Sequence, residues 1–163
     1  MKQRVRLSTF SIMLSGIVMI VLLCALYFSN SPVSICIISG ILIVCCALTL
    51  YYMPLSVSVC DGELRVNCII RTKRIPLREI SSIERLQSTM LGRRVFGNDG
   101  WFGYWGWYRD KTLGTYFAYY GNEADCFIVR LNKGKQYVLG CDNPDAIINY
   151  IQLLLSDKTQ AAP

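Results

Sequence analysis

Hydrophobic positions are concentrated in the first third of the chain, where residues 7–60 contain no charged side chain. A Ser-Asn-Ser-Pro break at residues 29–32 divides this stretch, because proline cannot continue a helix and the other three residues favour turns. Apolar runs remain at residues 10–28 and 33–52. As helices, they reach roughly 28–30 Å, the thickness of a bilayer's hydrocarbon core. The pattern predicts two transmembrane helices that form an antiparallel hairpin.

The positive charges that flank the two runs predict the orientation of the hairpin. Lys2, Arg4 and Arg6 precede the first run, the connection has no charge, and a basic stretch begins at Arg65 after the second. Lysine and arginine are enriched on the cytoplasmic side of membrane proteins, so both termini are expected in the cytoplasm, with residues 1–9 as a basic N-terminus. The competing interpretation is a cleaved signal peptide. The first run is longer than a typical signal core and a second span follows at once, which favours the hairpin.

After the second span the pattern changes to short runs of β-branched and aromatic residues separated by turns. An Asp-Gly pair at residues 61–62 lies between runs at 55–59 and 64–70, an arrangement typical of a β-hairpin. A second predicted hairpin turns through Asn-Lys-Gly-Lys at residues 132–135. The strands of this second hairpin are predicted at residues 126–131 and 136–140. Two further strands are predicted at residues 80–86 and 114–120.

The end of the chain has the period of an amphipathic helix. Asn143 is a predicted N-cap, and Pro144 fits the first helical position. The apolar residues that share one helix face are Ile147, Ile148, Ile151, Leu154 and Leu155. We expect this helix to cover an open end or face of the sheet, and residues 157–163 to form a flexible tail.

Short antiparallel strands followed by one amphipathic helix are the order of pleckstrin-homology (PH) domains. The segments that carry the resemblance are Leu55-Ser-Val-Ser-Val-Cys-Asp-Gly-Glu-Leu64, Arg74-Ile-Pro-Leu-Arg-Glu-Ile-Ser-Ser-Ile-Glu84, Arg94-Val-Phe-Gly97, Gly100-Trp-Phe-Gly-Tyr-Trp-Gly106 and Leu113-Gly-Thr-Tyr-Phe117. Together they resemble bacterial PH domains of the membrane-attached kind, with the domain at residues 54–156. The resemblance implies an α+β fold with a curved, seven-stranded antiparallel sheet or barrel and a capping helix. It also implies a multi-pass protein of the bacterial inner membrane, without enzymatic activity.

Composition and charge narrow the function further. The chain has no histidine, which excludes histidine-based triads, dyads and zinc motifs. Its carboxylate pairs fit turns, solvated surface and a helix start, and the spans lack the ionisable groups of an ion pathway. Of the net charge of +6, only +3 belongs to the part after the spans, too little to indicate nucleic-acid binding. We expect no enzyme and no cofactor.

The eight cysteines predict neither a disulfide framework nor a metal site. Four lie in the apolar runs, where a thiol behaves as a small apolar group. The other four, Cys60, Cys68, Cys126 and Cys141, are scattered singly without a C-x-x-C pair, in a domain expected in a reducing compartment. We expect buried free thiols and no bound metal.

Residues 96–120 hold 11 of the 19 aromatic residues, including Trp101, Trp105 and Trp107, and glycine recurs every third residue in positions 97–106. In one interpretation the aromatics fill the core of a small barrel and the glycines permit bends. In the other, this segment is a glycine-flexible loop that docks on the membrane, where Trp and Tyr favour the headgroup level. The basic residues expected to contact lipid phosphates in the second interpretation are Arg93, Arg94, Arg109 and Lys111.

Arg71, Lys73 and Arg74 form a second basic cluster. Eukaryotic PH domains bind inositol phosphates with basic residues around their first hairpins, so the resemblance implies a headgroup contact here. A topology anchor or a solvated surface explains the same charges. Two functions follow as hypotheses. One is a membrane-anchored, non-catalytic binding module that recognises inner-leaflet lipid or a protein partner. The alternative is a structural or assembly subunit whose helical hairpin packs on another membrane protein.

Overall fold

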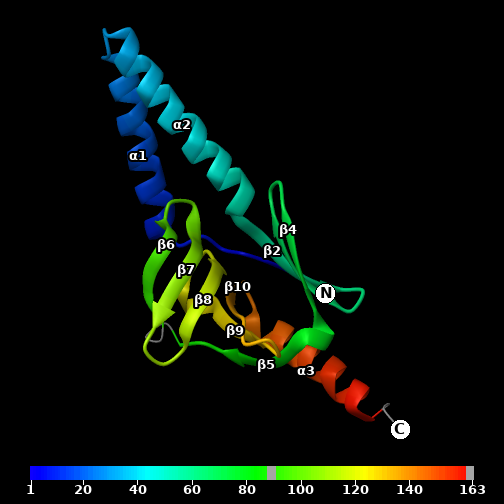
Figure 1. Cartoon of the computed structure of the whole chain (residues 1–163). Coiled ribbons are helices and arrows are strands. Elements are labelled where there is room, and N and C mark those ends of the chain that lie inside the picture. The colour runs from blue at the N-terminus through cyan, green and yellow to red at the C-terminus, as the bar shows by residue number, and fades with distance from the viewer. Residues whose placement is uncertain (88–90, 161–163) are drawn as a thin grey trace.

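An α-helical hairpin stands on a β-rich domain (Figure 1) in the computed structural model, which describes residues 1–87 and 91–160. Helix α1 (Thr9–Tyr27) and helix α2 (Pro32–Tyr52) end within one residue of the predicted bounds. Ser8 caps α1 by accepting a hydrogen bond from the Ser11 N–H at 3.1 Å. Both helices are long and apolar enough to cross a membrane. They diverge toward the domain.

The first sheet follows directly from α2 and is wholly antiparallel. Its strands, in spatial order, are β1 (Lys2–Arg4), β2 (Pro54–Cys60), β3 (Glu63–Cys68) and β4 (Thr72–Pro76). The predicted Asp-Gly turn is confirmed, with Asp61 and Gly62 at φ 53° and 71°. Strand β1 is not predictable from its three polar residues. It forms because α2 leads straight into β2, and the chain ahead of α1 pairs with that strand. The start of α1 and the end of α2 are therefore both joined to the first sheet, α1 through β1 and α2 through β2.

The second sheet continues from a 3₁₀ turn at Leu77–Glu79. Its strands, in chain order, are β5 (Ile80–Arg85), β6 (Arg93–Gly100), β7 (Gly103–Asp110), β8 (Gly114–Tyr120), β9 (Cys126–Leu131) and β10 (Gln136–Gly140). Their spatial order is β5-β9-β10-β8-β7-β6, and all neighbours are antiparallel except β10 and β8. The predicted curved antiparallel architecture is confirmed. It has one parallel pair, and it is divided into two sheets where the resemblance implied one.

Helix α3 (Pro144–Gln160) closes the core between the sheets, as predicted. The Asn143 side chain accepts a hydrogen bond from the Ala146 N–H at 3.1 Å, which confirms the N-cap. Ile147 and Ile151 are fully buried among side chains of both sheets. The helix continues to Gln160, so the predicted tail begins as helix, and its residues 161–163 lie outside the described part of the chain.

Residues 1–8 cross both sheets before α1 begins. The Asp142 N–H donates to the Arg4 carbonyl at 2.8 Å, and the Ser8 N–H donates to the Gly121 carbonyl at 2.7 Å. Arg6 forms an ion pair with Asp142 at 2.8 Å. A Cβ on Gly121 would lie 2.3 Å from the Arg6 carbonyl oxygen, so this approach requires glycine. The basic N-terminal segment thus ties the start of α1 to the domain.

Candidate membrane-facing site

Strands β6 and β7 form a long hairpin whose glycines face one another. Gly97 is paired with Gly106, and Gly100 with Gly103. A Cβ on Gly106 would lie 2.3 Å from the Phe96 carbonyl oxygen, and its φ is 130°, a conformation that favours glycine. The spacing of three is therefore symmetric about the turn at residues 101–102. That symmetry is the sequence signal that identifies this hairpin, and our sequence reasoning missed it.

The tip of this hairpin, Trp101 and Phe102, is a tight turn held by Asn98. The Asn98 side-chain amide donates to the carbonyl oxygens of Trp101 and, at 2.7 Å, Gly103. Its Oδ1 accepts from the Trp101 N–H at 3.3 Å. Phe102 has a φ of 49°, which is rare for an aromatic residue and signals a constrained turn. The hairpin therefore presents a rigid aromatic tip, and the expectation of a flexible loop in this segment is wrong because Gly97 to Gly106 are paired in two strands.

This tip reaches between the domain-side ends of α1 and α2 and bonds to both (Figure 1). Ser15 Oγ of α1 accepts from the Phe102 N–H at 2.8 Å. Thr49 Oγ1 of α2 accepts from Trp101 Nε1 at 2.9 Å. Each hydroxyl donates its own hydrogen to the carbonyl four residues earlier, at 2.6 Å for Ser15 and 2.8 Å for Thr49. Both hydroxyls are thus fully used in linking the domain to the helices.

The tip is level with the second turn of α1 and the last turn of α2. Ser15 is six residues, about 9 Å, inside α1, and Thr49 is three residues, about 4.5 Å, from the end of α2. Ser15 is buried to 1% exposure in an otherwise apolar helix. The sequence signal for this contact is the presence of hydroxyl side chains in two otherwise apolar helices. Ser11 and Ser15, for example, are four residues apart and therefore lie on one face of α1.

The β3–β4 turn forms a second contact at the end of α2. The Ile70 N–H donates to the Leu50 carbonyl at 3.1 Å, and the Ile70 side chain is 65% exposed. The Arg71 guanidinium carbon lies 5.3 Å from the centre of the Tyr51 ring, within cation–π range. This places the start of the predicted basic cluster beside the last turn of α2.

The other two members of that cluster lie further along β4. Lys73 Nζ is 5.3 Å from the centre of the Tyr137 ring. Arg74 is exposed and opposite Arg65 in the register. Arg65 is itself paired with Asp61 and Glu63, both at 3.0 Å. The cluster thus extends from the end of α2 along the outer edge of the first sheet.

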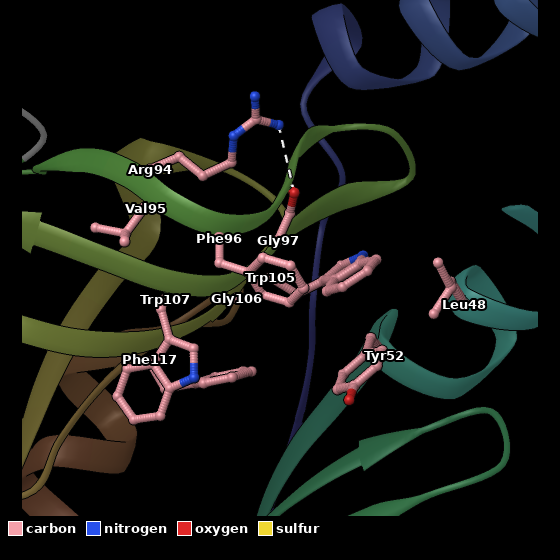
Figure 2. A pocket seen from close by; sticks show the side chains of 10 residues that line it. All are labelled: Leu48, Tyr52, Arg94, Val95, Phe96, Gly97, Trp105, Gly106, Trp107 and Phe117. Carbon is pink, nitrogen blue, oxygen red and sulfur yellow. Dashed lines mark hydrogen bonds between the residues drawn. The ribbon is translucent and has the colours of Figure 1, made fainter.

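A groove of about 610 Å³ separates the end of α2 from the β6–β7–β8 face (Figure 2). Tyr52 stacks on Trp105 at its base, with ring centres 4.5 Å apart and planes 11° apart. Trp107 packs edge-to-face on Phe117 at 5.2 Å. The complete lining is Leu48, Tyr52, Arg94, Val95, Phe96, Gly97, Trp105, Gly106, Trp107 and Phe117. Hence Trp105 and Trp107 of the predicted site share this groove. Arg94 borders it, but its guanidinium lies on the other side of β6, the side of its register partner Tyr108 (Figure 2).

The remaining predicted residues lie at the opposite end of the hairpin. Arg93 is directly across from Arg109 in the register, and Lys111 follows β7. Arg93 is eight residues from Trp101, roughly 26 Å along an extended strand. The ten residues singled out from the sequence are therefore not one cluster. They fall at the β3–β4 edge, at the hairpin tip, in the groove and at this far end.

Tyrosines of the aromatic segment fill a second core on the other face of the second sheet. Tyr104 stacks on Tyr120 and Tyr108 on Tyr116, with ring centres 4.8 and 5.9 Å apart. The Tyr108 hydroxyl donates to the Asn98 carbonyl at 2.8 Å. Burial raises the pKa of Tyr108 and Tyr120 far above the ordinary value, so both stay neutral. The interpretation in which the aromatic residues fill a core is therefore correct for these four tyrosines.

Three of the domain's cysteines are buried. Desolvation raises the pKa of the Cys68 thiol to about 11 and of the Cys141 thiol to about 12, and raises the pKa of Cys126 as well. Cys60 is exposed at the end of β2, so the expectation of a buried thiol is wrong for this residue, which directly precedes the Asp61-Gly62 turn. Within residues 1–87 and 91–160, no group of three or more His, Cys, Asp or Glu residues is arranged to hold a metal ion.

Comparison with known proteins gives one match. The sequence model of a family described as "Bacterial PH domain" matches residues 55–154, which span β2 to most of α3. No curated protein and no solved structure matches the chain.

Proposed function

Since the chain belongs to the bacterial PH-domain family, a family of binding modules, we propose that it is a membrane-anchored, non-catalytic module that recognises anionic lipid of the inner leaflet. In this proposal α1 and α2 cross the bacterial cell membrane and both termini are cytoplasmic. PH domains are generally non-catalytic, and the lack of histidine in this chain removes the commonest general base.

The observation that carries the proposal is the double contact of the β6–β7 tip with Ser15 and Thr49. If the helices span the bilayer, these bonds hold the domain flat against one leaflet. The β3–β4 turn, bonded to Leu50, then lies at the headgroup level. There Arg71, Lys73 and Arg74 each gain about 1 kcal/mol near an anionic surface.

The test compares lipid selectivity of the full-length wild type and the Arg71→Glu, Lys73→Glu, Arg74→Glu variant. Each is released from nanodiscs of mixed phosphatidylglycerol and phosphatidylcholine, and the retained lipids are counted by native mass spectrometry. We expect the wild type to retain phosphatidylglycerol preferentially and the variant to lose that preference by about tenfold or more.

The matched control is Lys133→Glu, Lys135→Glu in the β9–β10 turn, which removes positive charge from exposed positions elsewhere on the domain. It should leave the preference unchanged. Equal retention of both lipids by the wild type would contradict the proposal. A preference that survives the triple reversal would instead support the alternative, a subunit whose helices pack on another membrane protein.

A further inference from the structure

Two hairpin turns of the domain are apolar, and both bond to the helices. They are Ile69-Ile70 between β3 and β4, and Trp101-Phe102 between β6 and β7. The turns at residues 61–62 and 132–135 instead have the polar composition that is usual for turns. Trp101 and Phe102 are half-buried at the helices, so packing explains them. The two isoleucines are 47% and 65% exposed, and packing does not explain them.

The β3–β4 turn is fixed at the end of α2 because that helix lacks a hydrogen-bond donor there. In a continuing helix the Leu50 carbonyl would accept from the N–H of residue 54, but residue 54 is proline and has none. The Ile70 N–H takes this place at 3.1 Å. The contact of Arg71 with the Tyr51 ring, at 5.3 Å, holds the same turn a second time. The turn therefore lies beside the last turn of α2 (Figure 1).

The exposed apolar surface of α2 continues onto this turn. Leu50 and Tyr51 are 41% and 38% exposed, and Ile69 and Ile70 extend the same surface away from the helix. If α2 spans the membrane, the lipid around its last turn also meets the isoleucines. The backbone suits such surroundings, since the Cys68 N–H donates to the Arg71 carbonyl at 2.7 Å and the Ile70 N–H donates to Leu50.

The charges that follow the turn match those of an anionic leaflet. Two apolar residues are followed by Arg71, Lys73 and Arg74, which is the order of acyl chains and phosphates from the bilayer interior outward. The alternative occupant is another protein or a second copy. A stable protein interface uses about 20–30 residues on each side, far more than two exposed side chains provide. The surface is thus suited to lipid.

We propose that Ile69 and Ile70 form a wedge that inserts among the acyl chains at the boundary of the inner leaflet, with Arg71 at the level of the phosphates. The inference rests on the part of the proposed function in which α2 spans the membrane. It adds to that function an apolar contact that does not depend on lipid charge. The wedge sets the depth of the β3–β4 edge, so that Lys73 and Arg74 are held close to the lipid headgroups.

The experiment uses the full-length protein in nanodiscs of phosphatidylglycerol and phosphatidylcholine with a trace of photoreactive phosphatidylcholine. One preparation has the diazirine near the ester end of an acyl chain, and the other has it at the end of the chain. After illumination and trypsin digestion, mass spectrometry measures the label on the peptide of residues 66–71. We expect the shallow probe to label Ile69 and Ile70 at least about tenfold more than the deep probe, which should label the centres of α1 and α2.

Two matched double variants test whether the apolar side chains cause the insertion. Ile69→Ser with Ile70→Ser should reduce labelling of this peptide by about tenfold, because two apolar side chains no longer favour the acyl region. Ile69→Leu with Ile70→Leu should retain the labelling. Both positions are exposed, and the backbone bond from residue 70 to Leu50 is available to all these residues, so the fold is unaffected. Labelling of α1 and α2 should continue in both variants.

The wedge is overturned if the turn takes no label from either probe while the helices are labelled, which is also the result that a protein covering the turn would give. It is equally overturned if the serine variant is labelled as strongly as the wild type. The proposed lipid recognition fails separately. A labelled turn in a protein without preference for phosphatidylglycerol overturns the recognition and supports the wedge, whereas a preference that persists with an unlabelled turn overturns the wedge alone.

Discussion

Two hydroxyl side chains connect the two apolar helices with the domain. Ser15 and Thr49 each donate to their own helix and accept from the β6–β7 tip. Hydrogen bonds of this kind between membrane segments contribute about 0.6–2 kcal/mol each. Because they come from opposite helices, they fix the position of the tip relative to both.

The exposed cysteine of the domain should react with a thiol reagent at a pH at which the three buried cysteines remain protonated and unreactive. In inverted membrane vesicles at pH 8, a membrane-impermeant maleimide should label Cys60 and not Cys68, Cys126 or Cys141. Only the thiolate reacts, and burial raises the pKa of Cys68 to about 11 and of Cys141 to about 12, so both remain protonated thiols. Labelling is measured by mass spectrometry of peptides.

Unfolding in detergent and urea is the control, and all four domain cysteines should then be labelled. The same reagent applied to intact protoplasts should leave Cys60 unlabelled if the domain is cytoplasmic. Labelling of Cys60 from outside the cell would contradict the proposed orientation, and labelling of Cys141 in the native protein would contradict its burial.

At the scale of elements, the β6–β7 hairpin depends on strands that approach more closely than side chains allow. We expect Gly106→Ala to lower the free energy of unfolding by more than about 2 kcal/mol. The alanine would adopt a φ of 130° with its Cβ 2.3 Å from the Phe96 carbonyl oxygen. Urea denaturation in detergent, followed by tryptophan fluorescence, gives this free energy.

Gly134→Ala separates backbone strain from steric overlap. Gly134 also has a positive φ, 75°, but a Cβ there would meet nothing within 4 Å. Its cost should remain near the 1–2 kcal/mol of a left-handed residue. If Gly106→Ala proves no more destabilising than Gly134→Ala, the close packing of the hairpin is wrong.

Elements with a local signal were predictable from the sequence. The two long apolar helices, the Asp61-Gly62 turn, the β9–β10 hairpin and the cap at Asn143 each depend on neighbouring residues, and all are present. Strand β1 was not predictable, because its pairing depends on a strand more than fifty residues away. The regular spacing of the glycines is visible in the sequence, but the contact of Gly97 with Gly106 follows only from the pairing of β6 with β7.

The candidate site was predictable by residue type and not by arrangement. Tryptophans, arginines and a nearby membrane indicated lipid contact. No residue pattern distinguishes Arg94, which shares a sheet face with Tyr108, from Arg93, which is opposite Arg109 at the start of the hairpin arm. The bulge between Arg94 and Phe96 decides which face each arginine shares with the aromatic residues: Arg94 lies on the face of Tyr108, whereas Phe96 lies on the face of Trp107. Bulges arise from strand pairing that no local pattern specifies.

The whole molecule is a bacterial PH domain attached to two long apolar helices at several points. The chain passes from α2 into β2 directly, residues 1–8 tie α1 to both sheets, and the β6–β7 tip bonds to both helices. A domain on a flexible linker samples many orientations, whereas these contacts select one. The lipid proposals depend on this, because they require the β3–β4 turn to face the leaflet.

The most direct test of this fixed arrangement is disulfide formation between Ser15→Cys and Phe102→Cys in native membranes, in a chain whose own cysteines are replaced by alanine. Ser15 Oγ and Phe102 N are 2.8 Å apart, which brings the two Cα atoms within disulfide range. Mild oxidation should yield the linked peptide in high proportion. Gly16→Cys with Phe102→Cys is the matched control, since a Cβ at residue 16 faces open space. The account predicts a bond for residue 15 and little for residue 16; no bond, or equal yields, would contradict it.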